Sequence, residues 1–294
     1  MRFSKTIQDV FTDVFVYFIL ITFAVLCLYP IIYIFSLSIS DPVFVRRMEV
    51  WLLPKGFSLQ SFKLIFDHPY INKSYLNSIF YTLAGTAYSM VLTILGAYVL
   101  SRKRLIGRNV IMFGIWFTMV FTGGLVPTYL LVNDLNMINT RWSLIIPTAI
   151  SQYNLIIMRT SMLEIPDSLE ESAKIDGFNA FRIMVNIIIP TSLPVIATVS
   201  LFYGVWIWNS YFSALIYLSS KDLYPLQAIL RELLVAYTDN FTDLGKMDPR
   251  TQTMFTPFGF RAAVVVVSIL PMMFVYPFIQ KYFVTGIMVG SIKG

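Results

Sequence analysis

Six long apolar stretches constrain the fold of this 294-residue chain more than any other feature. An α-helix needs about 20 largely apolar residues to cross the roughly 30 Å hydrocarbon layer of a lipid bilayer. A backbone inside that layer must satisfy its own hydrogen bonds, which favours helices. We therefore predict an all-α polytopic membrane protein with six transmembrane helices, in a single membrane domain over residues 1–294. The stretches cover residues 14–38, 77–100, 109–132, 143–159, 193–218 and 260–284.

The composition also fits a lipid environment. Hydrophobic residues make up 57% of the chain, charged residues make up 13%, and the mean hydropathy is +0.70. Soluble domains are about one quarter charged, so this chain is unusually poor in charge. The net charge is +6. Because no run of Lys and Arg alternates with aromatic residues on a polar face, the sequence gives no support for nucleic-acid binding.

The fourth stretch, 143–159, is the least regular of the six. Gln152, Tyr153 and Asn154 interrupt it and Arg159 closes it. Polar groups at this depth face other helices or a wet cavity rather than lipid, so we expect a short or irregular helix. Internal prolines also remove hydrogen-bond donors and predict kinks in the apolar stretches. They are Pro30, Pro127, Pro147, Pro271 and Pro277.

The basic residues of the short links predict the orientation. The link 101–108 carries four Lys or Arg residues, whereas the link 133–142 carries only Arg141. Positive charge collects in cytoplasmic loops, so the link 101–108 is expected inside. Alternation then places both termini and the segment 160–192 in the cytoplasm. The same alternation places residues 39–76, 133–142 and 219–259 outside.

The segment 160–192 has strong signals for helix boundaries. Asp167 can cap a helix start, with Glu170 completing an acidic variant of the capping box. Gly177 is well placed to end that helix in a left-handed conformation, and Asn179 can cap a second helix that runs toward Pro190. The predicted structure is a helix, a glycine turn and a second helix on the cytoplasmic face.

The spacing of this segment resembles the "EAA" loop of ABC importer permeases, most closely the carbohydrate-type, maltose-like branch. In that branch Asp commonly precedes the glycine, as Asp176 does, and a Trp-Asn pair follows in the next span, as Trp208-Asn209 does. Ser172 in place of alanine and Ile189 in place of leucine depart from the pattern. The matching run is Glu171-Ser172-Ala173, three residues, Gly177, nine residues, Ile187, one residue and Ile189-Pro190.

The resemblance implies that the short helix is a coupling helix that docks onto a separate, dimeric ATPase. ATP and magnesium would then bind to the ATPase, and this chain would be neither an enzyme nor the holder of a cofactor. Implied partners are a second homologous permease, forming a heterodimer, and an extracytoplasmic solute-binding protein that touches the loop 219–259. The implied location is the cytoplasmic (inner) membrane of a prokaryote. The coupling residues carried over are Glu171, Ser172, Ala173, Asp176, Gly177 and Pro190.

Spans four and five supply candidates for a sugar path. Carbohydrate sites combine aromatic faces with a few amide or hydroxyl groups. Aromatic residues also gather at membrane interfaces as anchors, so this alternative stays open for the tyrosine and the tryptophans. The expected cargo is an oligosaccharide or a uronate-containing fragment. The candidates are Gln152, Tyr153, Asn154, Trp206, Trp208 and Asn209.

Competing functions lack their expected residues. An ion-coupled secondary transporter needs ionisable groups near mid-membrane, and none lies centrally in any predicted span. His68 is the one histidine, so a zinc-type metal site and a histidine-based membrane enzyme are disfavoured. The chain also lacks a Walker-type loop, so ATP hydrolysis would require another subunit. An ABC permease for another solute class and a homodimer both remain open.

Overall fold

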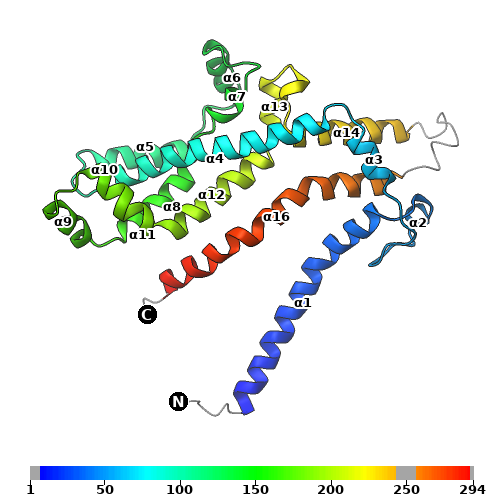
Figure 1. The fold of residues 1–294 in the computed structure, drawn as a ribbon, viewed down its shortest axis with the longest axis horizontal. Helices are drawn as coiled ribbons and strands as arrows, with labels where there is room; N and C mark the ends of the chain where they lie inside the picture. Colours follow the sequence, from blue (N-terminus) through cyan, green and yellow to red (C-terminus); the bar gives the residue numbers. More distant parts are fainter. Residues whose placement is uncertain (1–6, 243–255, 292–294) are drawn as a thin grey trace. The chain divides into compact units, whose positions relative to one another are not determined.

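The computed structural model describes residues 7–242 and 256–291, and within these residues the chain is helical without strands, which confirms the all-α fold class (Figure 1). The helices are α1 (Ile7–Ser38), α2 (Pro42–Arg46), α3 (Gln60–Phe66), α4 (Ile71–Ser101), α5 (Arg108–Val120), α6 (Leu125–Asp134), α7 (Trp142–Ile145), α8 (Gln152–Leu163), α9 (Asp167–Ile175), α10 (Ala180–Ile183), the π-helix η1 (Met184–Ile188), α11 (Ile189–Thr191), α12 (Leu193–Trp208), α13 (Phe212–Tyr217), the 3-10 helix η2 (Lys221–Leu223), α14 (Leu226–Thr242) and α16 (Pro257–Ser291).

The chain divides into two compact units. One unit holds residues 1–69 and 230–270, and the other holds residues 70–229 and 271–294. Every candidate site residue predicted from the sequence lies in the second unit. The single membrane domain stays a prediction, because the division describes packing within the chain and does not test membrane insertion.

Three helical stretches are long and apolar enough to cross a bilayer without a break. They are Phe11–Ser38, Ile71–Ser101 and Pro257–Pro277. Two further pairs qualify only if each bent pair counts as one span: α5 with α6 bends by 112°, and Ala180–Thr191 with α12 bends by 82°. The described residues therefore hold three to five spans by length and composition, and the count of six stays a prediction.

The predicted third span, 109–132, bends where glycines follow one another. α5 ends at Val120, and Gly124 caps α6 with φ 85° and ψ 179°, a backbone conformation that essentially only glycine adopts. The predicted fourth span is divided into α7 and α8. The 12 residues of α8 reach only about 18 Å, which is too short to cross the bilayer alone.

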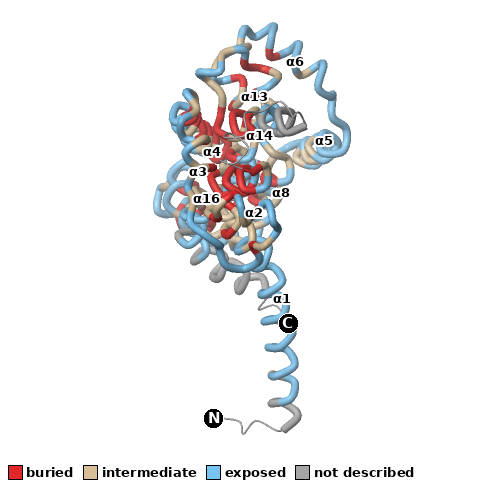
Figure 2. The backbone as a smooth tube through the Cα atoms, turned by 90° about the vertical axis from the view of Figure 1, so that its right-hand side faces the viewer, coloured by how far each residue is buried: buried red, intermediate tan, exposed pale blue. Residues whose placement is uncertain are grey.

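Over residues 14–32, α1 is apolar around its circumference and every residue is exposed (Figure 2). None of its 18 most apolar consecutive residues is buried within the chain. A helix that is hydrophobic on all sides belongs in an apolar environment. Lipid or another subunit can supply that environment.

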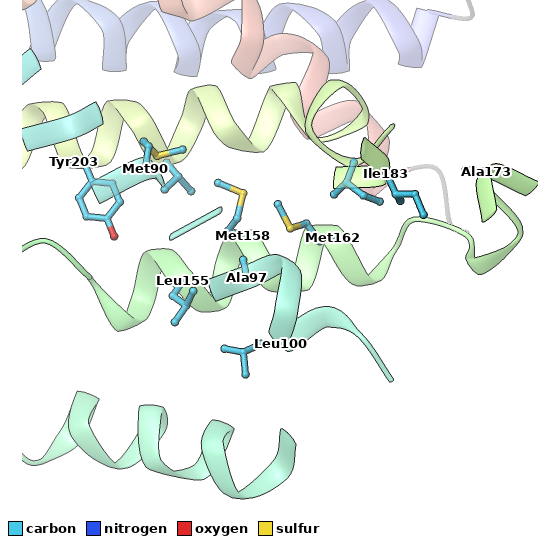
Figure 3. Packing of buried hydrophobic residues seen from close by; sticks show 11 residues of the cluster. Met90, Ala97, Leu100, Leu155, Met158, Met162, Ala173, Ile183 and Tyr203 are labelled. Atoms are coloured by element: carbon cyan, nitrogen blue, oxygen red, sulfur yellow. The ribbon is translucent and has the colours of Figure 1, made fainter. Parts of the chain in front are cut away.

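The second unit is built on a buried cluster that joins α4, α8 and α12 to the segment containing α9 and α10. Met158 and Met162 of α8 are 0% and 2% exposed, and Figure 3 shows them among side chains from the neighbouring helices. Ala173 of α9 and Ile183 of α10 belong to the same cluster. The short helices α9 and α10 are thus packed directly against α4, α8 and α12.

Candidate functional site

The segment 160–192 folds into the predicted helix, glycine turn and helix. Gly177 has φ 78°, and its N–H donates to the Lys174 carbonyl at 3.1 Å while the N–H of Phe178 donates to the Ala173 carbonyl at 2.9 Å. This pair of hydrogen bonds is a Schellman motif, which ends α9 in a fixed geometry. Asn179 then caps α10, because its Oδ1 accepts the N–H of Arg182 at 2.8 Å. Both predictions are confirmed.

The predicted capping box at the start of α9 is wrong. Asp167 is the first helical residue rather than the cap, and the cap position belongs to Pro166, which has no side chain to accept a hydrogen bond. Asp167 still places negative charge in the first turn, where the helix dipole favours it. The Glu170 side chain turns to other partners instead of reaching back to the cap.

One face of α9 is directed into the protein. Glu170 and Ala173, three residues apart, are 8% and 4% exposed. Residues at this spacing share a helix face. Ala173 belongs to the Glu-Ser-Ala run, but it packs against the protein interior. A partner protein would therefore not touch it in this conformation.

The opposite face is open and carries both charge and apolar surface. Glu171, Ser172 and Asp176 are exposed. Ile175, the last residue of α9, is 87% exposed, and Phe181 in the adjoining α10 is 66% exposed. The sequence analysis did not select these two residues. A sequence feature that could have identified them is an apolar side chain on a short helix that is otherwise rich in charged residues. A polar anchor beside projecting apolar groups is a surface suited to a protein partner.

A cavity of about 410 Å³ lies between α9 and the link 101–108 that follows α4, and charged side chains from both segments line it. Arg102 forms an ion pair with Glu170, and its guanidinium also lies 4.5 Å from the centre of the Tyr98 ring. Lys174 Nζ lies 3.9 Å from Glu170 Oε2. The two basic neighbours offset the cost of holding the Glu170 carboxylate away from water.

A second ion pair reinforces this contact at the surface. Lys103 Nζ donates to Asp167 Oδ2 at 2.7 Å. That hydrogen bond and the charge of Lys103 lower the pKa of the Asp167 carboxyl, and Arg102 and Lys174 add to the effect. Burial lowers the pKa of the Arg102 guanidinium from its ordinary value, opposed by Tyr98 and Asp167. Arginine nevertheless stays charged in proteins.

Pro190 lies in α11, where the segment 160–192 leads into α12. It has no N–H to donate to the carbonyl of residue 186, and the preceding residues Met184–Ile188 form a π-helix. A π-helical turn accommodates the disrupted hydrogen-bond ladder and often marks functional positions. The chain then bends by 82° before Leu193. Pro190 thus lies at the bend where Ala180–Thr191 meets α12.

A separate cavity of about 570 Å³ lies between the start of α8 and the C-terminal half of α12. Four of the six candidate path residues line it. Within the described residues, no hydrogen bond involves the side-chain polar groups of Gln152, Tyr153 or Asn154. Amide groups and an aromatic ring therefore face one hollow, with no charged side chain among its lining residues. The four residues are Gln152, Tyr153, Asn154 and Trp206.

The other two candidates lie elsewhere. Trp208 is 3% exposed and lines a different, apolar hollow, with its ring 6.5 Å from that of Tyr75. Asn209 follows the last residue of α12, and its Nδ2 donates to the Val205 carbonyl at 2.8 Å. The structure therefore brings Trp206 to the amide-lined cavity and separates Trp208 and Asn209 from it.

Metal-binding groups are not assembled in the part of the chain that the structure covers. In residues 7–242 and 256–291, no three His, Cys, Asp or Glu side chains lie close enough together to hold an ion. The predictions that this chain holds no metal and no cofactor stay predictions.

Comparisons with known proteins agree with the resemblance seen in the sequence. "Polygalacturonan/rhamnogalacturonan transport system permease protein YtcP" of Bacillus subtilis (strain 168) is 43% identical over 286 residues, which cover 96% of this chain and 98% of that protein. "Protein LplC" of the same organism is 39% identical over 267 residues, covering 90% of this chain and 89% of that protein.

Two solved structures are similar in fold. One is described as a bacterial ABC transporter involved in the import of the acidic polysaccharide alginate, with a TM-score of 0.82, 34% identity, and coverage of 95% of this chain and 99% of that chain. The other is a bacterial alginate ABC transporter in complex with an alginate pentasaccharide-bound periplasmic protein. Its TM-score is 0.56 at 14% identity, with 92% of this chain and 94% of that chain covered, so it supports the fold alone.

The family described as "Binding-protein-dependent transport system inner membrane component" matches residues 2–289, nearly the whole sequence. The structure places an exposed Glu171 on a helix that a Schellman motif ends at Gly177 and that packs against the spans. This chain therefore belongs to the binding-protein-dependent transport system inner membrane components, which confirms its resemblance to ABC importer permeases.

Proposed function

We propose that this chain is the permease subunit of an ABC importer for oligosaccharides that contain uronate units, driven by ATP hydrolysis on a separate dimeric ATPase. α9 is the coupling helix, and it docks onto that ATPase in the cytoplasm. The complete importer also contains a second homologous permease and an extracytoplasmic solute-binding protein. Both termini of this chain lie in the cytoplasm, and residues 1–294 form one membrane domain.

The two faces of α9 carry this proposal. Glu170 and Ala173 hold one face against the spans, while Glu171 and Ile175 project from the other. A helix fixed on one side and open on the other transfers the movement of a docked protein to the element behind it. Gly177 and Pro190 set the turns that connect this helix to span five.

The substrate class rests on similarity and on the amide-lined cavity. The relative named for polygalacturonan and rhamnogalacturonan and the alginate transporter both concern acidic polysaccharides. Within this chain, Gln152 and Asn154 offer amides for sugar hydroxyls, and Trp206 offers a ring face. Because the lining residues include no charged side chain, we expect this cavity to contact hydroxyl groups and the apolar sugar face. The carboxylates would then be contacted elsewhere in the importer.

A pull-down tests the assembly. The tagged chain is purified in mild detergent from its native host, co-purifying proteins are identified by mass spectrometry, and ATPase activity is measured in the eluate. Recovery of an ATPase and a second permease supports the proposal. Recovery of the chain alone without ATPase activity, in repeated preparations, contradicts it and favours an ion-coupled secondary transporter.

Single substitutions test the docking face. Glu171→Ala removes the projecting carboxylate, so we expect ATP-driven uptake of labelled oligogalacturonate to fall while membrane insertion stays normal. Glu164→Ala is the matched control, because Glu164 is also an exposed carboxylate but lies at the end of α8, outside α9. Equal uptake by both variants would remove Glu171 from the docking surface.

Uptake of a neutral oligosaccharide in place of oligogalacturonate would instead overturn the substrate class.

A further inference from the structure

α4 is an unbroken helix whose two ends contact different parts of the chain. Its 31 residues span roughly 46 Å, more than the thickness of the hydrocarbon layer. The two other uninterrupted span candidates contain prolines, Pro30 in α1 and Pro271 in α16. α4 contains none, so its hydrogen-bond ladder has no proline-induced break.

The cytoplasmic end of α4 is joined to α9 and α10. Arg102, the residue directly after α4, forms the ion pair with Glu170, and its Nε donates to the Tyr98 carbonyl in the last turn of α4 at 3.3 Å. The Tyr98 hydroxyl donates to the Ala180 carbonyl at the start of α10 at 3.1 Å. A displacement of α9 therefore acts on the α4 backbone through a largely buried ion pair.

The other end of α4 holds residues 222–226, part of the predicted outer loop. Asn77 Nδ2 donates to the Asp222 and Tyr224 carbonyls at 2.8 and 3.2 Å. One turn further along, the Tyr81 hydroxyl donates to the Leu223 carbonyl at 2.7 Å. The Leu226 N–H donates to Ser78 Oγ at 2.7 Å, and Lys73 pairs with Asp222 at 2.7 Å.

These outer contacts come from one side of the helix. Residues 73, 77 and 81 recur every four positions, so they share a face. Asn77 and Ser78 are 3% and 2% exposed. Breaking such a contact leaves polar groups without a partner away from water, which is costly. The segment 222–226 is therefore held to α4 and is expected to move with it.

We propose that α4 is a strut that carries movement of the coupling helix α9 to the segment 222–226, with the Arg102–Glu170 ion pair as its inner joint and Asn77 as its outer joint. This inference rests on the proposed docking of α9 onto an ATPase. Arg102, Glu170 and Asn77 are positioning residues in this mechanism, since each acts through α4. Attachment of α4 to α12 through Thr93 and Tyr203 makes the strut part of a moving bundle.

Hydrogen–deuterium exchange on the assembled transporter tests the strut. The complex is purified through a tag on this chain, placed in lipid nanodiscs, and compared without nucleotide and after trapping with Mg-ATP and orthovanadate. The expected result is slower exchange in α9 on trapping, together with a change in peptides covering residues 222–226. The Leu226 amide is the most direct reporter, because its N–H is bonded to Ser78 of α4.

Substitutions at each joint separate transmission from simple stability. In Glu170→Gln, exchange in α9 should still slow on trapping while the response at residues 222–226 is lost. The charge swap of Arg102→Glu with Glu170→Arg should restore the distant response. Lys103→Gln, which breaks the neighbouring exposed pair with Asp167, is the matched control and should preserve it. If Glu170→Gln does not assemble, Asn77→Ala tests the outer joint with an intact inner one, and its response at residues 222–226 should be lost.

The outcomes distinguish this inference from the function on which it rests. If trapping slows exchange in wild-type α9 but leaves residues 222–226 unchanged, the strut is wrong and docking stands. A distant response that persists in Glu170→Gln, or one that the charge swap fails to restore, removes the ion pair as the joint. A response that persists in Asn77→Ala removes the outer joint. If exchange in wild-type α9 does not slow, docking itself fails and the strut fails with it.

Discussion

The hydroxyl group of Tyr203 lies 2.8 Å from the hydroxyl group of Thr93 and joins α12 to α4. The same tyrosine oxygen accepts the backbone N–H of Ser151 at 2.9 Å, at the start of α8. Tyr203 and Thr93 are 3% and 0% exposed. One side chain therefore connects three helices of the second unit, beside the amide-lined cavity.

Tyr203→Phe should destabilise the protein without emptying the core. The ring remains, but the Ser151 N–H loses its acceptor and Thr93 loses a partner, which costs about 1–2 kcal/mol. Thermal unfolding in detergent should show a lower midpoint. Tyr153→Phe is the control, because Tyr153 is 54% exposed and its hydroxyl makes no hydrogen bond among the described residues. Equal midpoints for the two variants would contradict the structural role of Tyr203.

Trp206 and Trp208 should respond differently to truncation. Trp208→Ala empties a buried site and should cost about 3–5 kcal/mol of stability. Trp206 is 50% exposed and lines the amide-lined cavity, so Trp206→Ala should raise the concentration of labelled oligogalacturonate needed for half-maximal uptake. Its unfolding midpoint should stay near that of wild type. An unchanged uptake curve for Trp206→Ala would remove this ring from the sugar path.

The different surroundings of these two tryptophans show what sequence reasoning could not reach. Residues two apart on a helix point about 200° apart, so helix geometry separates Trp206 and Trp208, which the sequence analysis had placed together in the sugar path. Which side of α12 faces a cavity depends on how α4 and α8 pack against it, and the local sequence around the two tryptophans does not determine that packing. The Arg102–Glu170 pair poses the same problem, because 68 positions separate its members along the chain.

Local signals were more informative. Gly177 and Asn179 could be assigned their turn and cap because backbone conformation and short-range hydrogen bonds decide those positions. The bend in the predicted third span also had a local signal, the Gly123-Gly124 pair. The span was predicted from the length of its apolar stretch alone, and that criterion does not detect a bend. The capping box failed because the helix begins at Asp167, one residue earlier than predicted, so that Glu170 is its fourth residue and pairs with Arg102 instead.

Gly177→Ala should reduce stability through the backbone alone. No atom lies within 4 Å of the position that an added Cβ would occupy, so the cost arises from the positive φ, about 1–2 kcal/mol. Gly114→Ala is the matched control, since Gly114 also has open space but lies inside α5, where alanine is favoured by up to about 1 kcal/mol. Thermal unfolding should therefore move in opposite directions. A Gly177→Ala variant as stable as Gly114→Ala would contradict the left-handed turn.

The Lys103–Asp167 pair should make a contribution to stability that disappears in acid. Lys103 lowers the pKa of folded Asp167 below the ordinary value of 3.8, so the folded protein holds this proton less tightly than the unfolded chain. The contribution is therefore fully present above pH 3.8 and is lost as the pH falls through the lowered pKa. The difference in unfolding midpoint between wild type and Asp167→Asn should be constant from neutral pH down to about 4 and should shrink below it. In the Lys103→Gln background, Asp167→Asn should have a smaller effect and a weaker pH dependence, because the largest interaction is gone and only the charges of Arg102 and Lys174 remain. A difference that grows on acidification would show that Asp167 is destabilised by its surroundings, opposite to the sign that its contact with Lys103 requires.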